Sequence, residues 1–124
     1  MGPGFVCTCS ALLLITAAVH SVLGERRLIM PLLRSREGVL GVDLARFLLR
    51  FVWHFMSILF AIIAVTLMAY QHDAGRGRTV LLLATAIGVG GAGLVDAVAT
   101  RGRHIGWPLL VLIGISALFG LMAS

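Results

Sequence analysis

Residues 51–70 read FVWHFMSILFAIIAVTLMAY and contain no aspartate, glutamate, lysine or arginine. An α-helix of about 20 residues rises about 30 Å, which matches the hydrocarbon core of a bilayer. Charge stops at Arg50 and resumes only after Tyr70, so the apolar run has sharp limits. This stretch therefore predicts a helix that crosses a membrane.

Three further stretches of similar length have the same apolar character. The four predicted spans cover residues 5–24, 51–70, 79–99 and 105–122. Of the 124 residues, 60% are hydrophobic and 12% are charged, and the mean hydropathy is +1.06. About 25% of residues are charged in an average soluble domain, so lipid is the expected solvent here. We predict one all-α integral membrane domain over residues 1–124, an antiparallel bundle of four transmembrane helices.

The arginines are concentrated in two of the three connections between these spans. All 10 basic residues are arginine, and all but Arg76 and Arg78 lie in the first and third connections. Arginine-rich connections stay on the cytoplasmic side of a bacterial-type inner membrane. We therefore expect a multi-pass inner-membrane protein with both termini outside. Its arginines would contact anionic lipid headgroups, and no nucleic-acid partner is expected.

The first connection, residues 25–50, is the longest segment outside the predicted spans and alternates basic with apolar residues. Such a segment is expected to lie along the cytoplasmic interface, with its arginine side chains reaching the headgroups. Pro31 argues against one uninterrupted helix, because proline cannot donate the interior backbone hydrogen bond. Asp43 is the predicted N-cap of a helix that continues into the second span.

Four side chains that a membrane interior tolerates poorly fall at one predicted depth. His20, His54, Asp96 and His104 each lie near the cytoplasmic end of an apolar segment. At 1.5 Å per residue, all are within about 6 Å of that boundary, and Glu25 ends the first span at nearly the same level. Ionisable groups in a bilayer usually face a cavity or one another, so a shared polar site is expected.

Helical periodicity also predicts on which side of its helix each of these residues lies. His54 shares a helical face with Ser57, and Asp96 shares one with Ala92. Small neighbours let helices pack closely, so these two side chains and His20 are expected to point into the bundle. The assignment of His104 to the polar site rests on its predicted depth alone, and that of Glu25 rests on its position directly after the first span.

Two interpretations of this polar layer stay open. Three imidazoles and one or two carboxylates could bind a divalent transition metal such as zinc or iron. The expected metal ligands are His20, His54, Asp96, His104 and Glu25. Two of them, His20 and His54, could instead be the axial ligands of a b-type haem. In the alternative interpretation these groups meet water or headgroups, and Asp96 pairs with Arg101 or Arg103.

Two further functions are compatible with the sequence. Gly88, Gly90, Gly91 and Gly93 match the spacing of a dinucleotide-binding motif, but no acidic residue follows at the required distance. They predict close helix packing instead, as in a non-catalytic accessory or assembly subunit of a larger membrane complex or in a homo-oligomer.

The other function is proton-coupled transport through His20 or Asp96. The size and the helix count resemble the small multidrug transporters, although that family has an acidic residue in the first span, where this chain has His20. No nucleophile or phosphate-binding loop is apparent, so a non-enzymatic role is the expectation.

Overall fold

The computed structural model describes residues 3–123, and these residues form an all-α fold. The helical elements join into four rods. The first rod consists of α1 (Pro3–Val19), the π-helix η1 (His20–Ile29) and α2 (Met30–Ser35). The short 3₁₀-helix η2 (Gly38–Gly41) connects it to the second rod, α3 (Asp43–His72). The third rod consists of α4 (Ala74–Thr85), the π-helix η3 (Ala86–Gly90) and α5 (Gly91–Ala99), and the fourth rod is α6 (Trp107–Met122).

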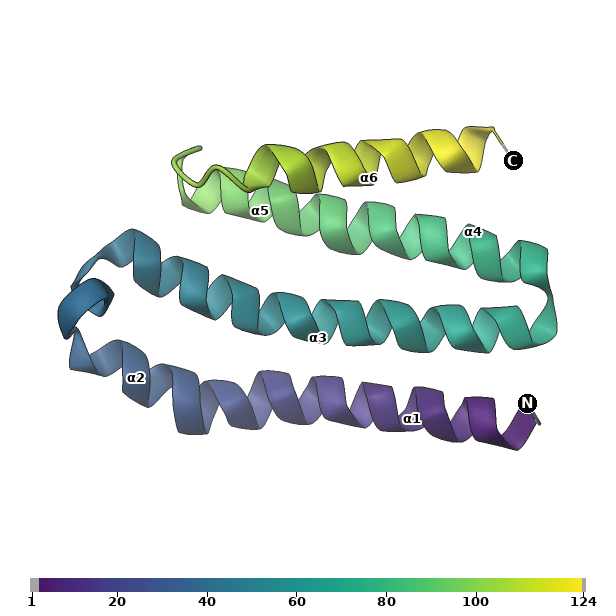
Figure 1. Ribbon diagram of the computed structural model, residues 1–124, viewed down its shortest axis with the longest axis horizontal. Helices are drawn as coiled ribbons and strands as arrows, with labels where there is room; N and C mark the ends of the chain where they lie inside the picture. Colours follow the sequence, from purple (N-terminus) through teal and green to yellow (C-terminus); the bar gives the residue numbers. More distant parts are fainter. Residues whose placement is uncertain (1–2, 124) are drawn as a thin grey trace.

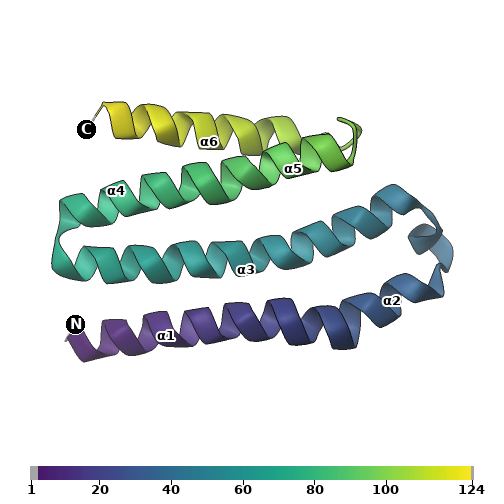
Figure 2. The same ribbon diagram turned by 180° about the vertical axis from the view of Figure 1, so that it is seen from behind.

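The rods lie side by side in the order of the sequence, and successive rods run in opposite directions (Figure 1). The first rod packs on α3, α3 packs on α4, and the third rod packs on α6 along its length. The first and fourth rods lie at the two edges of this row, as the view from behind also shows (Figure 2). The row is therefore more open than the bundle expected from the sequence.

Three of the rods have the length and composition of membrane-crossing helices. The helical stretches Val6–Ser35, Asp43–His72 and Ala74–Ala99 are long and apolar enough to cross a membrane. The fourth, Trp107–Met122, is also apolar but has 16 residues. That length rises about 24 Å, less than the roughly 30 Å of a hydrocarbon core. The prediction of an all-α chain with four helices is confirmed, with one helix shorter than the others.

The connection between the first two rods is much shorter than expected. Helix continues through residues 25–35 and begins again at Asp43, so residues 36–42 make the connection. Pro31 does not interrupt the helix, because it lies in the first turn of α2, where a missing backbone N–H is tolerated. The wider turns of η1 directly precede it. At Arg36 the backbone turns left-handed, with φ of 52°, and the first rod ends.

The prediction that Asp43 is an N-cap is wrong, because the cap lies one residue earlier. The N-cap of α3 is Val42, and Asp43 is the first helical residue, where its carboxylate lies 3.2 Å from the Arg46 guanidinium. A carboxylate in the first turn still interacts favourably with the helix dipole. The carboxylate that caps a helix is Asp73, which accepts a hydrogen bond from the backbone N–H of Arg76 at the start of α4.

Most of the glycines predicted to allow close packing contact other helices of the same chain. A Cβ atom on Gly114 would lie 2.6 Å from the Cα atom of Gly90, so the third and fourth rods touch through their backbones. A Cβ on Gly93 would lie 2.8 Å from Cβ of Leu110. On another side of the third rod, Gly88 faces α3. Around Gly91, no atom of the described residues comes within 4 Å of such a Cβ, so this glycine faces outward.

Candidate functional site

The predicted polar layer separates into two clusters and one stacked histidine. The Glu25 cluster consists of Ser21, Glu25, Arg50 and His54 and joins η1 to α3. The Asp96 cluster consists of Asp96, Thr100 and His104 and joins the end of α5 to the connection before α6. His20 belongs to neither cluster and lies against Trp53.

Glu25 is the centre of the first cluster. Its Oε1 atom lies 2.6 Å from Nη2 of Arg50, and its Oε2 atom lies 3.3 Å from Nε2 of His54. The other ring nitrogen of His54, Nδ1, is hydrogen-bonded to the Ser21 hydroxyl at 2.7 Å. Both imidazole nitrogens therefore contact the first rod. Arg50 and His54 lie one helical turn apart on α3, which is why both reach the same carboxylate.

His20 makes reciprocal contacts with Trp53. The two rings are stacked with centroids 4.1 Å apart and an interplanar angle of 14°. The indole N–H of Trp53 donates to the His20 carbonyl at 2.9 Å, and Nε2 of His20 lies 3.1 Å from the Trp53 carbonyl oxygen. Gly24 makes room for the indole, because a Cβ there would lie 2.5 Å from Cζ2 of Trp53. This contact locks the first rod to α3.

The Asp96 cluster is more deeply buried. The Asp96 side chain is fully buried, and its Oδ2 atom lies 2.5 Å from Nδ1 of His104. The Thr100 hydroxyl donates to the Asp96 carbonyl at 2.7 Å and accepts a longer bond from the His104 backbone N–H. The other carboxylate oxygen, Oδ1, is buried and makes no hydrogen bond to any described residue. Asp96 thus pairs with His104, and not with Arg101 or Arg103 as the alternative interpretation expected.

The structure does not support the expected shared metal site, and the ring nitrogens of His20 and His54, the expected haem ligands, have different partners. Within residues 3–123, no group of three or more His, Cys, Asp or Glu side chains is arranged to hold a metal ion. The five expected ligands form two separate pairs, Glu25 with His54 and Asp96 with His104, while His20 stacks on Trp53. The reason is the row of rods. The first pair lies between the first two rods, and the second lies where the third rod meets the fourth.

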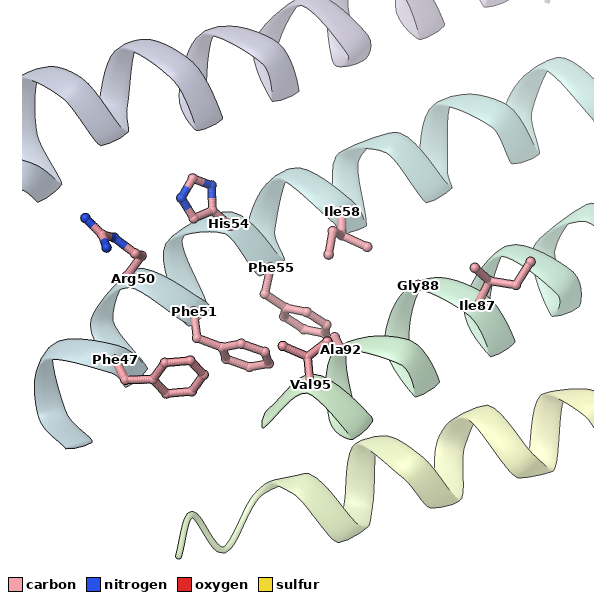
Figure 3. Close-up of a pocket in the computed structure, with 10 residues that line it drawn as sticks. All are labelled: Phe47, Arg50, Phe51, His54, Phe55, Ile58, Ile87, Gly88, Ala92 and Val95. Carbon is pink, nitrogen blue, oxygen red and sulfur yellow. The ribbon is translucent and has the colours of Figure 1, made fainter. Parts of the chain in front are cut away.

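A groove between α3 and α5 was not anticipated from the sequence. It has a volume of about 470 Å³, and its walls include Phe47, Phe51 and Phe55 on one side and Ala92 and Val95 on the other. The three phenylalanine rings point toward α5, whereas Arg50 and His54 point toward the first rod (Figure 3). We call this space the α3–α5 groove.

Some of these residues had a detectable signal in the sequence. Phe47, Phe51 and Phe55 recur at steps of four, which places them on one helical face. Thr100 lies four residues from both Asp96 and His104. The stacking of His20 on Trp53 had no such signal, because it depends on how two rods pack.

The fold and these clusters define a class: a small all-α protein with three helices long and apolar enough to cross a membrane. No protein-family description, curated protein or solved structure matches the chain.

Proposed function

We propose that the chain is a non-catalytic accessory subunit of a larger membrane complex. The observation that supports this best is how its ionisable side chains pair with one another. Glu25 pairs with His54 between η1 and α3, and Asp96 pairs with His104 of the connection before α6, so the four side chains do not meet in one site. A transporter or an enzyme would need such groups to face a substrate site. Here they hold together an open row of helices with apolar sides.

The most suitable surface for a partner lies on the outer side of the third and fourth rods. A hollow of about 290 Å³ is present there, with small residues at its base and apolar side chains around it. Its lining residues are Ala86, Ile87, Gly90, Gly91, Leu94, Val111, Gly114, Ile115 and Leu118. Small residues let a second helix approach closely in lipid. Because Gly90 already packs on Gly114, Gly91 is the glycine that faces this partner.

The topology belongs to the same proposal. Residues 36–42 and 100–106 connect the rods at one end, which we call the basic end because the arginines other than Arg76 and Arg78 lie towards it. Both termini lie at the opposite end (Figure 1). The positive-inside rule places the basic end in the cytoplasm of a bacterial-type cell and both termini outside.

Cysteine labelling tests this topology. In a background with Cys7→Ser and Cys9→Ser, a membrane-impermeant maleimide should label His72→Cys in intact spheroplasts. Ser35→Cys should be labelled only after permeabilisation, because it lies at the basic end. Labelling of Ser35→Cys in intact spheroplasts would reverse the orientation.

Site-specific photo-cross-linking tests the subunit role. A photoreactive residue at Leu94, which lines the outer hollow, should form a discrete adduct with one membrane protein that also co-purifies stoichiometrically in mild detergent. The same residue at Ile15, exposed on the first rod, is the control and should not form that adduct. Gly91→Leu should abolish the adduct without unfolding the chain. A homo-oligomer alone, with no second protein, would contradict the proposal.

Proton-coupled transport is the second candidate, and it rests on Asp96. A fully buried carboxylate with one oxygen that makes no hydrogen bond to the described residues is the kind of group that functions as an intramembrane proton site. In proteoliposomes, substrate uptake driven by a pH gradient should then be lost in Asp96→Asn. Uptake that survives this substitution would eliminate the candidate.

A further inference from the structure

The α3–α5 groove lies where the second and third rods separate. The two rods are joined at the turn around Asp73, where α3 packs extensively on α4, and α3 makes few contacts with η3. Alongside α5 the rods lie further apart than at that turn (Figure 1). The groove volume of about 470 Å³ lies within the range of about 300–1,000 Å³ that is usual for ligand pockets.

The walls of the groove suit an extended hydrocarbon chain. Phe47 and Phe51 are stacked with ring centroids 5.8 Å apart, and Phe51 and Phe55 with centroids 5.9 Å apart. The interplanar angles are 25° and 12°, so the three rings form a nearly continuous strip. At 1.5 Å per residue this strip is about 12 Å long. Val95, more than half exposed, faces it from α5 (Figure 3).

The groove lies between two rods that are long and apolar enough to cross a membrane, so lipid acyl chains surround it there. An acyl chain is much narrower than an α-helix, which is about 10 Å across, and can lie along the strip of rings.

At the basic end of the groove, Phe47 also lines a second, charged hollow. Beyond Phe47, a space of about 210 Å³ is lined by residues that include Asp43, Thr100 and Arg103. Asp43 is paired with Arg46, whereas Arg103 makes no ion pair within the described chain. The Nε–H group of Arg103 donates to the Thr100 carbonyl at 3.2 Å, which holds the guanidinium beside the hollow. A guanidinium in this position can bind a phosphate with its remaining N–H groups.

We propose that an anionic phospholipid occupies the α3–α5 groove. One acyl chain lies along the strip of Phe47, Phe51 and Phe55, and the phosphate group binds Arg103. The bound lipid fills the gap between the second and third rods and stabilises their separation. This lipid site is distinct from the outer hollow that contains Gly91, so it does not depend on the subunit role.

Lipid retention in native mass spectrometry tests the site. The full chain is delipidated in detergent, incubated with phosphatidylglycerol or with phosphatidylcholine of the same chain length, and washed. Wild-type protein should retain one phosphatidylglycerol and about tenfold less phosphatidylcholine, because the choline cation of the second lipid already offsets the phosphate charge that Arg103 binds.

Two variants locate the binding. Val95→Trp should fill the groove and reduce retention of both lipids, while Arg103→Gln should reduce retention of phosphatidylglycerol more strongly than that of phosphatidylcholine, so that the two lipids are retained more equally. Their matched controls are Leu109→Trp on the outer side of α6 and Arg101→Gln, an exposed neighbour that does not line the hollow, and both should bind lipid as wild type does. Circular dichroism checks that each variant keeps the helical content of the wild type.

Three results would overturn the proposal. The first is equal retention of the two lipids by wild-type protein. The second is unchanged retention in a folded Val95→Trp variant. The third is a cross-link from Val95 to another protein or to a second copy of the chain, which would show that a protein fills the groove.

Discussion

The carboxylate of Glu25 and the guanidinium of Arg50 form an ion pair of 2.6 Å that joins η1 to α3. His54 approaches the second oxygen of the same carboxylate, one turn further along α3. A buried or half-buried carboxylate in an apolar chain is costly unless it is paired. Glu25 is paired with Arg50 through one oxygen and approached by His54 at the other, so its structural role is to hold the first rod in place.

A double-mutant cycle should detect this ion pair. Glu25→Gln and Arg50→Gln should each destabilise the fold, and their effects should be non-additive by about 0.5–1 kcal/mol, because half-exposed pairs and interhelical polar contacts contribute about that much. Thermal unfolding in detergent, followed by circular dichroism, measures the coupling. Combining Arg50→Gln with Glu37→Gln, an exposed residue of the 36–42 connection, is the control and should be additive.

Because Gly90 and Gly114 are in contact, the effect of an alanine substitution on stability should depend strongly on which glycine is replaced. Gly114→Ala should destabilise the protein by about 1–3 kcal/mol, as overpacking usually does, because the new methyl group would meet the backbone of Gly90. Gly91→Ala adds the same methyl group where the described residues leave open space, so stability should hardly change. Equal unfolding temperatures for the two variants would show that the third and fourth rods do not pack through these glycines.

The Asp96–His104 pair should control the connection between the third and fourth rods. Asp96→Ala leaves His104 without its hydrogen-bonding partner and should cost about 1–3 kcal/mol, as loss of a buried hydrogen bond does, whereas Asp96→Asn should cost less because it keeps a hydrogen-bonding side chain. Limited trypsin digestion should cut the Asp96→Ala variant faster at the exposed Arg101 and Arg103.

A substitution at the opposite end of the molecule serves as the control for this digestion. Asp73→Ala removes the cap of α4 and should cost about 1 kcal/mol. It should speed cleavage at Arg76 without affecting Arg101. If Asp96→Ala left cleavage at Arg101 and Arg103 unchanged, the pair would not hold this connection.

Removal of divalent metals should leave the protein unchanged. The His54 nitrogens contact Ser21 and Glu25, and Nε2 of His20 contacts the Trp53 carbonyl, so these imidazoles already have partners in the chain. Treatment with a chelator should not shift the unfolding temperature. A decrease that added zinc reverses, and that His20→Ala abolishes, would show that these side chains bind a metal after all.

The sequence alone determined the helices and their electrostatic asymmetry, because these depend on local composition. The apolar runs predicted the positions of the four helices, and the arginines marked the end of the molecule at which residues 36–42 and 100–106 connect the rods. The extension of the first helix to Ser35 was missed, because a basic amphipathic segment has the same composition whether it continues a helix or lies along a membrane surface.

The tertiary structure decided which polar side chains meet. Depth along a helix follows from counting residues, yet Glu25 and His54 pair between the first two rods, whereas Asp96 and His104 pair beside the last connection. Direction around a helix does not follow so simply, because the π-helices η1 and η3 widen the turns that separate His20 from Glu25 and Gly88 from Asp96. The order of the rods in an open row then placed His54 against the first rod and Asp96 beside His104. Residues that the sequence predicted at similar depth therefore bind different neighbours, since each helix contacts only those beside it in the row.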